Sequence, residues 1–209
     1  MPLPLTDEVR EALAALLADG RRKLLGLVGA PGAGKSTLAQ CIADALGERV
    51  QVVPMDGFHL AQVELERLGR AARKGAPDTF DAAGYVALLH RLRRQRGDEI
   101  VYAPAFRREI EEPIAGAIAV LPQTQLVITE GNYLLLDDGP WAAVAPLLDE
   151  AWYIEVDEVA RRARLVRRHQ QFGRSAEEAR VWEAATDQPN AVRIEATRAR
   201  AQRVVPWGA

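Results

Sequence analysis

One glycine-rich stretch carries the residue types that bind a triphosphate. The segment GAPGAGKS, from Gly29 to Ser36, fits the pattern G-x-x-x-x-G-K-S/T, with an apolar run before it and a helical pattern after it. Glycine backbone lets a phosphate approach closely, and the N–H groups and helix dipole at this point favour an anion. In this pattern the lysine reaches the β- and γ-phosphates and the serine supplies a hydroxyl to Mg²⁺. The residues predicted to bind a nucleoside triphosphate are Gly29, Ala30, Pro31, Gly32, Ala33, Gly34, Lys35, Ser36 and Thr37.

Two carboxylates stand where apolar strands are expected to end. Asp56 ends the run VQVVPMD, and Glu130 ends the run LVITE. Ligands of open parallel sheets lie beyond the carboxyl ends of the strands, so Asp56 would accept a proton from an incoming hydroxyl or hold a metal-bound water. Glu130 and Ser36 would hold Mg²⁺, directly or through water. The alternatives are that Asp56 is a turn or helix-cap residue and that Glu130 is a surface residue at a strand end.

Residues beside these carboxylates are candidates for contact with a second substrate, the phosphate acceptor. Phe58 follows Asp56 after one glycine, which lets the chain turn and places an aromatic ring beside the acceptor. His59 either contacts the acceptor or is an ordinary loop histidine. Asn132 and Tyr133 come directly after the second carboxylate, so we expect them to line the same cleft.

An arginine-rich helix offers groups that could stabilise a phosphoryl group in transfer. In RRARLVRRHQQFGRS, Arg164 and Arg168 are four residues apart and share a helix face, and Arg174 follows the helix-breaking glycine. A mobile guanidinium can bind the charge that develops on the γ-phosphate while it excludes water. We predict that these three arginines belong to a lid at about residues 161–190, whereas Arg161 and Arg162 form a solvated face.

The elements that must position these residues alternate between strand and helix. Strands are expected in KLLGLVG, VQVVPMD, EIVYAP, LVITEG and AWYIEV, and a further short strand-like run ends the chain. Helices are expected in TDEVREALAALLADG, STLAQCIADALG, DAAGYVALLHRLRRQRG and DEVARRARLVRRHQQFG, with Thr6 and Asp157 as N-caps and a new helix after Pro189. This order predicts an α/β fold: a P-loop NTPase-type, doubly wound parallel sheet of about five strands flanked by helices.

The chain length of 209 residues fits a single domain with mobile appendages. The irregular stretch LGRAARKGAPDTF, residues 68–80, is predicted to be a working loop within an acceptor-side segment at about residues 57–80. The other appendage is the arginine-bearing lid.

Composition argues against several partners. The formal net charge of −2 gives no electrostatic basis for binding nucleic acid or a membrane surface. A lone cysteine, Cys41, excludes an internal disulfide and is predicted to be a buried, inert thiol. Because no apolar run reaches about 18 residues and no leader pattern opens the chain, we expect a soluble cytoplasmic protein, either a monomer or a homodimer.

The lysines argue against a GTPase switch. A GTPase recognises guanine through N-K-x-D or T-K-x-D, and Lys23, Lys35 and Lys74 lie in neither pattern. DAAG at Asp81 matches D-x-x-G but opens a predicted helix, and the L-S-G-G-Q signature of ABC ATPases is absent. Phosphoryl transfer to an acceptor is therefore favoured over switching.

Several motifs together resemble one kinase group. GAPGAGKST, PMDGFH, GAPDTFD, PAF and ITEGNYLLL occur in the same order as in the uridine kinase, pantothenate kinase and phosphoribulokinase group of P-loop kinases. The chain looks most like the small bacterial members, often labelled fructose-transport-system or nucleoside-type kinases, over about residues 24–203. The resemblance implies that Asp56 is the base and that Glu130 lies near the metal. It also implies acceptor contacts from Phe80, Asp81, Arg107, Arg108 and, unless it only caps a helix, Asn190.

The sequence departs from these relatives at the acceptor side. It is much shorter than bacterial pantothenate kinases, and it has PAFRRE where uridine kinases carry a tyrosine. Arg107 and Arg108 suit an anionic or polyhydroxylated acceptor better than a nucleobase, unless they are solvated surface residues. We predict an ATP- and Mg²⁺-dependent kinase that phosphorylates a hydroxyl of a small metabolite. A sugar-like alcohol or a nucleoside is favoured, and a pantothenate-like acceptor stays open. The alternative is a regulatory or hydrolytic NTP-binding module.

Overall fold

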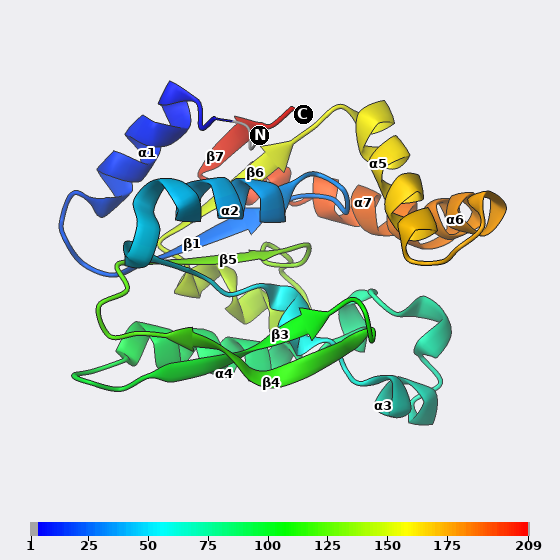
Figure 1. Cartoon of the computed structure of the whole chain (residues 1–209), viewed down its shortest axis with the longest axis horizontal. Helices are drawn as coiled ribbons and strands as arrows, with labels where there is room; N and C mark the ends of the chain where they lie inside the picture. Colours follow the sequence, from blue (N-terminus) through cyan, green and yellow to red (C-terminus); the bar gives the residue numbers. More distant parts are fainter. Residues whose placement is uncertain (1–3, 209) are drawn as a thin grey trace.

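The computed structural model describes residues 4–208, with a five-stranded parallel sheet at the centre (Figure 1). The strand order is β2 (Val50–Val52), β5 (Leu126–Gly131), β1 (Lys23–Val28), β6 (Glu150–Glu155) and β7 (Arg203–Pro206), and each neighbouring pair is parallel. The three central strands are almost continuously buried, as expected for strands covered on both faces. The predicted α/β class and parallel sheet are confirmed.

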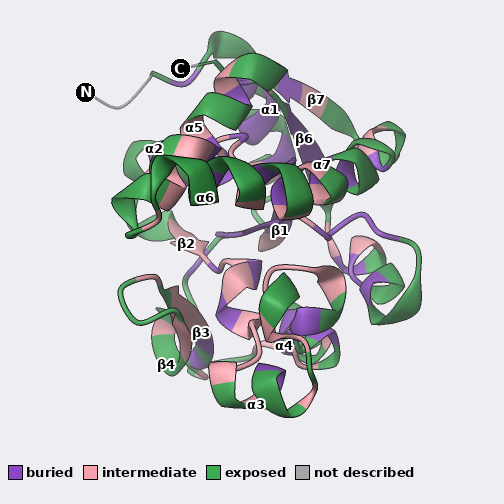
Figure 2. Ribbon diagram, turned by 90° about the vertical axis from the view of Figure 1, so that its right-hand side faces the viewer, coloured by how far each residue is buried: buried purple, intermediate pink, exposed green. Residues whose placement is uncertain are grey.

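Helices cover both faces of this sheet. α1 (Asp7–Leu17) and α2 (Lys35–Leu46) share one apolar cluster with the sheet, and α4 (Ala82–Arg94) belongs to a second. Leu24 of β1 lies in the cluster with α4, and Leu25 lies in the cluster with α1 and α2, because successive side chains of a strand point to opposite faces. Figure 2 shows buried residues along β1 and β6, between the exposed outer sides of the helices.

The second half of the chain adds a helical segment after β6. It consists of α5 (Glu158–Gln171), α6 (Ala176–Trp182), one π-helical turn over Glu183–Asp187 and α7 (Gln188–Glu195). Pro189 has no N–H to donate to the carbonyl four residues earlier, which accounts for the widened turn. In Figure 1, α5 and α6 lie at the end of the sheet toward which β1 points.

Helix ends follow the sequence signals. The Thr6 hydroxyl accepts a hydrogen bond from Val9 N (3.3 Å), and the Asp157 carboxylate accepts one from Ala160 N (2.9 Å), so both predicted N-caps are confirmed. Cys41 is buried in α2, as predicted. No helix within residues 4–208 has the length and apolar character needed to span a bilayer.

The main sheet does not contain all of the strands that were predicted for it. EIVYAP forms part of β3 (Val101–Arg107), which pairs antiparallel with β4 (Glu112–Val120) in a separate hairpin. β4 was not predicted, because its glycine, proline and alanines hide any strand pattern. The register shifts around Pro104, which has no N–H for a ladder. The fifth place in the main sheet is taken by β7.

The acceptor-side segment is less irregular than its sequence suggests. It contains α3 (Gln62–Arg67) and 3₁₀ turns at Ala71–Arg73 and Pro77–Thr79. A single antiparallel bridge joins His59 to Phe80 and closes the segment on itself. The tip of the β3–β4 hairpin and α3 lie below α5 and α6 at the same end of the sheet (Figure 1).

Candidate active site

A cavity of about 730 Å³ lies at the carboxyl ends of β1 and β5. Its walls are the glycine-rich loop, the segment that follows β2, the tip of the β3–β4 hairpin and the helices α5–α7. The structure thus brings together residues that are far apart in the sequence. Predicted site residues that line the cavity are Pro31, Gly32, Gly34, Lys35, Ser36, Thr37, Asp56, His59, Phe80, Arg108, Glu130, Asn132, Arg164, Arg168, Arg174 and Asn190.

Two glycines of the phosphate loop are required by its backbone. Gly32 has a φ of +81° and Gly34 a φ of +90°, where an L side chain would be strained. A Cβ at Gly32 would also lie 2.9 Å from Leu165 of α5, and one at Gly34 would lie 2.9 Å from Trp207. The loop is therefore packed closely against α5 and Trp207, the residue that follows β7.

Lys35 lies over this loop and is held by neutral oxygen atoms. Its Nζ donates to the carbonyl oxygens of Gly29 (2.8 Å) and Ala30 (3.2 Å) and to Oδ1 of Asn132 (2.8 Å). Burial lowers the pKa of its ammonium group to about 8, although the nearby carboxylate of Glu130 opposes this shift. Among residues 4–208, this buried ammonium group has no carboxylate hydrogen-bond partner, which suits it to bind phosphate.

Glu130 provides a buried carboxylate next to the phosphate loop. Ser36 Oγ donates to Glu130 Oε1 at 2.7 Å. Burial, and then the charge of Asp56, raises the pKa of the Glu130 carboxyl, while Lys35 and the hydrogen bond from Ser36 act in the opposite direction. A carboxylate and a hydroxyl beside a triphosphate site are the donor set that Mg²⁺ uses, since it takes one or two protein ligands plus phosphate and water oxygens.

Asp56 sits on a short 3₁₀ turn, Met55–Phe58, just after β2. Its Oδ2 lies 3.4 Å from a guanidinium nitrogen of Arg108, and both side chains are partly exposed to the cavity. Among the described residues, its carboxylate accepts no hydrogen bond from a backbone N–H, so the helix-cap alternative is not supported. The His59 ring packs on Phe80 with a centroid distance of 4.0 Å, and burial lowers the pKa of its imidazole.

Comparison with known proteins identifies the family, although no family model matches the sequence. The chain is 40% identical over 181 residues to a "putative uridine kinase" of Schizosaccharomyces pombe, a match that spans 82% of this chain and 77% of the other. An ATP-dependent kinase-like protein of Aspergillus versicolor is 38% identical, with 73% and 93% covered. The chain belongs to the uridine kinase-like group of P-loop kinases. This confirms the resemblance seen in the motifs, and it makes the protein an ATP-dependent small-molecule kinase.

A solved structure supports the same assignment for this kinase. The "putative fructose transport system kinase" of Silicibacter sp. TM1040 is 40% identical, has a TM-score of 0.84, and covers 93% of this chain and 98% of its own. The likeness therefore extends over nearly the whole of this kinase and is not confined to its sheet.

The three arginines of this kinase that were predicted to belong to a lid all line the cavity. Arg168 is half-buried, and burial together with the charge of Arg108 lowers the pKa of its guanidinium. Arg174 stacks on Trp182, with 3.9 Å between the guanidinium carbon and the ring centroid. Arg164 also lines the cavity. All three side chains therefore line the same cavity, but Arg168 lies near Arg108 whereas Arg174 stacks on Trp182.

The sequence-based interpretation of Arg161 is wrong. Its side chain is buried, with 4% exposed, because it lies between the phosphate loop and the start of α7. It donates to the carbonyl oxygen of Pro31 (3.2 Å) and to Oε1 of Gln188 (2.7 Å). Arg162 is on the solvated side as predicted and forms two 3.0 Å hydrogen bonds to Glu183. Arg161 is thus a positioning residue that joins α5 and α7 to the loop.

Some predicted residues do not line the cavity. Arg107 is exposed on the hairpin, and Phe58 packs against the core beside Tyr85. Asp81 is the N-cap of α4, with its carboxylate accepting from Gly84 N (2.8 Å).

Gly29, Ala30 and Ala33 of the phosphate loop are buried, and Ala30 and Ala33 line a smaller, separate cavity. Asn190 lies two residues inside α7 and is not its N-cap.

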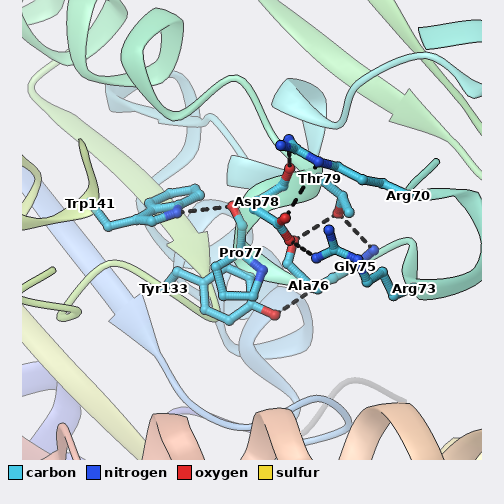
Figure 3. A network of polar contacts seen from close by, with 9 residues as sticks. All are labelled: Arg70, Arg73, Gly75, Ala76, Pro77, Asp78, Thr79, Tyr133 and Trp141. Atoms are coloured by element: carbon cyan, nitrogen blue, oxygen red, sulfur yellow. Dashed lines mark hydrogen bonds and ion pairs between the residues drawn. The ribbon is translucent and has the colours of Figure 1, made fainter. Parts of the chain in front are cut away.

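Tyr133 is fully buried and supports the acceptor-side segment instead of lining the cleft. Its hydroxyl donates to the carbonyl oxygen of Gly75, and Trp141 Nε1 donates to that of Pro77 at 3.1 Å (Figure 3). The sequence correctly predicts that Tyr133 lies near Glu130, but the Tyr133 side chain is buried and does not line the cavity. It also left out other lining residues, among them Gln62, Lys74 and Trp207, because they belong to no motif and only the fold shows that they reach the cavity.

Proposed function

We propose that this kinase transfers the γ-phosphoryl group of ATP, with Mg²⁺, to a hydroxyl of a small sugar-like alcohol or nucleoside. The single observation that carries the proposal is that Asp56 and the phosphate-binding residues Lys35 and Ser36 line one continuous cavity. The negative charge of Asp56 partly opposes the lowering of the Lys35 pKa by burial, so the two groups are near each other. A hydroxyl beside Asp56 would therefore lie near a phosphate held by Lys35.

The proposed roles follow from the contacts. The phosphate loop and Lys35 bind and orient the triphosphate, with Lys35 exchanging its carbonyl partners for phosphate oxygens. Ser36 and Glu130 would hold Mg²⁺, which neutralises charge on the phosphates when bound. Asp56 accepts the proton of the acceptor hydroxyl, and Arg164, Arg168 and Arg174 stabilise the charge on the transferred group.

We propose further that residues 161–190 form a mobile lid and residues 57–80 form the acceptor side of one catalytic domain. Closure of α5 and α6 over the nucleotide would exclude water, so that the acceptor hydroxyl, and not water, attacks the phosphorus. Arg161 supports this arrangement because it connects α5 and α7 to the phosphate loop.

A coupled assay of ADP release tests the proposed function. The enzyme with ATP and Mg²⁺ is given a panel of sugars, sugar acids, nucleosides and vitamin precursors. We expect ADP release to rise steeply with one member and to fall back when Asp56 is replaced by asparagine. Slow hydrolysis that no acceptor accelerates and that the replacement does not change would indicate the alternative, a hydrolytic or regulatory module.

The pKa of Lys35 gives a prediction that needs no acceptor. At pH 8.5, above its pKa of about 8, much of the free enzyme carries a neutral amine, whereas bound phosphates favour the ammonium form. Binding of ADP should therefore take up a fraction of a proton, and affinity should fall as the pH rises above about 8. Calorimetry in two buffers with different ionisation enthalpies measures this uptake. Lys35→Gln should abolish it, and an unchanged uptake would contradict the assignment.

A further inference from the structure

The acceptor end of the cavity carries two cations with no role in the mechanism above. Lys74 comes from the acceptor-side segment and Arg108 from the tip of the β3–β4 hairpin, and both line the cavity. Each of them also lowers the pKa of His59, in addition to the larger effect of burial. The two cations therefore converge on the same end of the cavity although they lie on different segments.

The loop that carries Lys74 is held in place by the network of Figure 3. On one side, the Tyr133 hydroxyl donates to Gly75 and the Trp141 indole donates to Pro77, so two buried aromatic residues anchor the backbone after Lys74.

On the other side of this loop, Arg73 and Arg70 form ion pairs with Asp78. The Thr79 hydroxyl accepts from Gly75 N (3.0 Å) and donates to the carbonyl oxygen of Ala76 (2.7 Å). Arg70 and Arg73 are therefore paired with Asp78, whereas Lys74, the third cation of this loop, lines the cavity.

Neither cation is well neutralised by the protein. Lys74 Nζ donates to the backbone carbonyl of Glu111 (2.6 Å) and lies 5.6 Å from the centre of the Phe106 ring. Within residues 4–208, no carboxylate oxygen lies within 4.0 Å of this amine. Arg108 has one long contact, 3.4 Å, to Asp56, and Asp56 is the group that must accept a proton. Both charges are thus available to an anion in the cavity.

We propose that the acceptor carries an oxyanion, a carboxylate or a phosphate, in addition to the hydroxyl that is phosphorylated, and that Lys74 and Arg108 bind this oxyanion. The inference rests on the proposed function. A guanidinium binds such a group through two parallel N–H donors, and an ammonium adds a point charge. The acceptor is then a hydroxy acid or a sugar phosphate, whereas a neutral nucleoside leaves both cations without a partner.

Binding of the oxyanion also releases the base. When Arg108 turns toward the acceptor, the Asp56 carboxylate loses its ion-pair partner and can accept the hydroxyl proton. The hydroxyl oxygen then forms a bond to the γ-phosphorus, and the bond from that phosphorus to the β–γ bridging oxygen breaks. ADP leaves with the bonding electron pair, and the proton stays on Asp56.

Matched pairs of acceptors test the proposal. We would compare gluconate with glucose, glycerate with glycerol, pantothenate with pantothenol, and glucose 6-phosphate with glucose in the coupled ADP assay. We expect the charged member of at least one pair to have a kcat/KM about 100-fold above that of its neutral partner, the factor that charge-assisted hydrogen bonds provide. The carboxylate and phosphate arms distinguish the two kinds of oxyanion.

Four variants locate the effect. Lys74→Gln and Arg108→Gln should each raise KM for the charged acceptor by about 10- to 100-fold and leave KM for ATP within about twofold. Lys74→Arg should restore part of the loss. Arg107→Gln is the matched control, because Arg107 is exposed on the same hairpin and does not line the cavity. Its kinetics should be unchanged.

The outcomes separate this inference from the function on which it rests. A neutral member phosphorylated as well as its charged partner, or equal losses for the Arg107 and Arg108 variants, overturns the inference and leaves the kinase function intact. If no acceptor of either kind accelerates ADP release and Asp56→Asn has no effect, the proposed function fails and the inference with it.

Discussion

Replacing Asp56 with asparagine is expected to lower kcat for acceptor phosphorylation by about 10²- to 10⁴-fold, the usual contribution of a general base. Asparagine keeps the size of the side chain and can still accept a hydrogen bond from the acceptor hydroxyl, but it cannot take the proton. Because the proposed triphosphate site is the phosphate loop and not Asp56, the affinity for ATP should stay within about twofold. Steady-state kinetics with a saturating acceptor, together with calorimetry for ATP, check both expectations.

Two controls keep this prediction specific. Asp44→Asn changes an exposed carboxylate near the end of α2 and should leave kcat unchanged. The loss of the ion pair to Arg108 is controlled by Arg108→Gln, which removes the same contact but keeps the base. If Asp56 is the base, kcat of the asparagine variant should stay low even at a saturating concentration of the acceptor. Near-normal turnover of Asp56→Asn would show that another group accepts the proton.

The parts of this site that depend on neighbours in the chain could be predicted from the sequence. The glycine loop, the N-caps at Thr6 and Asp157 and the carboxylates that follow two apolar strands are local patterns. Since parallel strands end at the same edge of a sheet, the convergence of Asp56 and Glu130 at one cavity also follows from the predicted topology. Their catalytic roles remain predictions.

The parts that depend on tertiary packing could not be predicted. β4 has no strand pattern of its own and exists because β3 needs a partner. Arg161 stands in a basic helix that resembles a solvated one, and its partner is a backbone carbonyl of Pro31, which has no sequence signal. Lys74 differs from an ordinary loop lysine only because Tyr133 and Trp141 fix its loop against the cavity.

Among the three arginines of the proposed lid, Arg168 is expected to matter most for turnover. Arg168 is half-buried at the cavity, and burial and the neighbouring Arg108 both lower the pKa of its guanidinium. Within the described residues, no carboxylate oxygen lies within 4.0 Å of it, so its charge is available to the phosphoryl group in transfer. Arg174 is stacked on Trp182 and would have to leave that ring to reach the phosphates.

Arg168→Ala should therefore lower kcat by about 10³-fold or more, as the loss of a transition-state arginine does in phosphoryl transfer. Arg167→Ala is the matched control, because Arg167 precedes it on the same helix but is exposed and should be replaceable without loss of turnover. The melting temperature of Arg168→Ala should not fall, since the variant removes a half-buried charge without a close carboxylate partner. If Arg168→Ala kept its turnover and Arg174→Ala lost it, Arg174 and not Arg168 would be the arginine that contacts the phosphoryl group in transfer. The structure would then be an open state, in which Arg174 stacks on Trp182 until the lid closes.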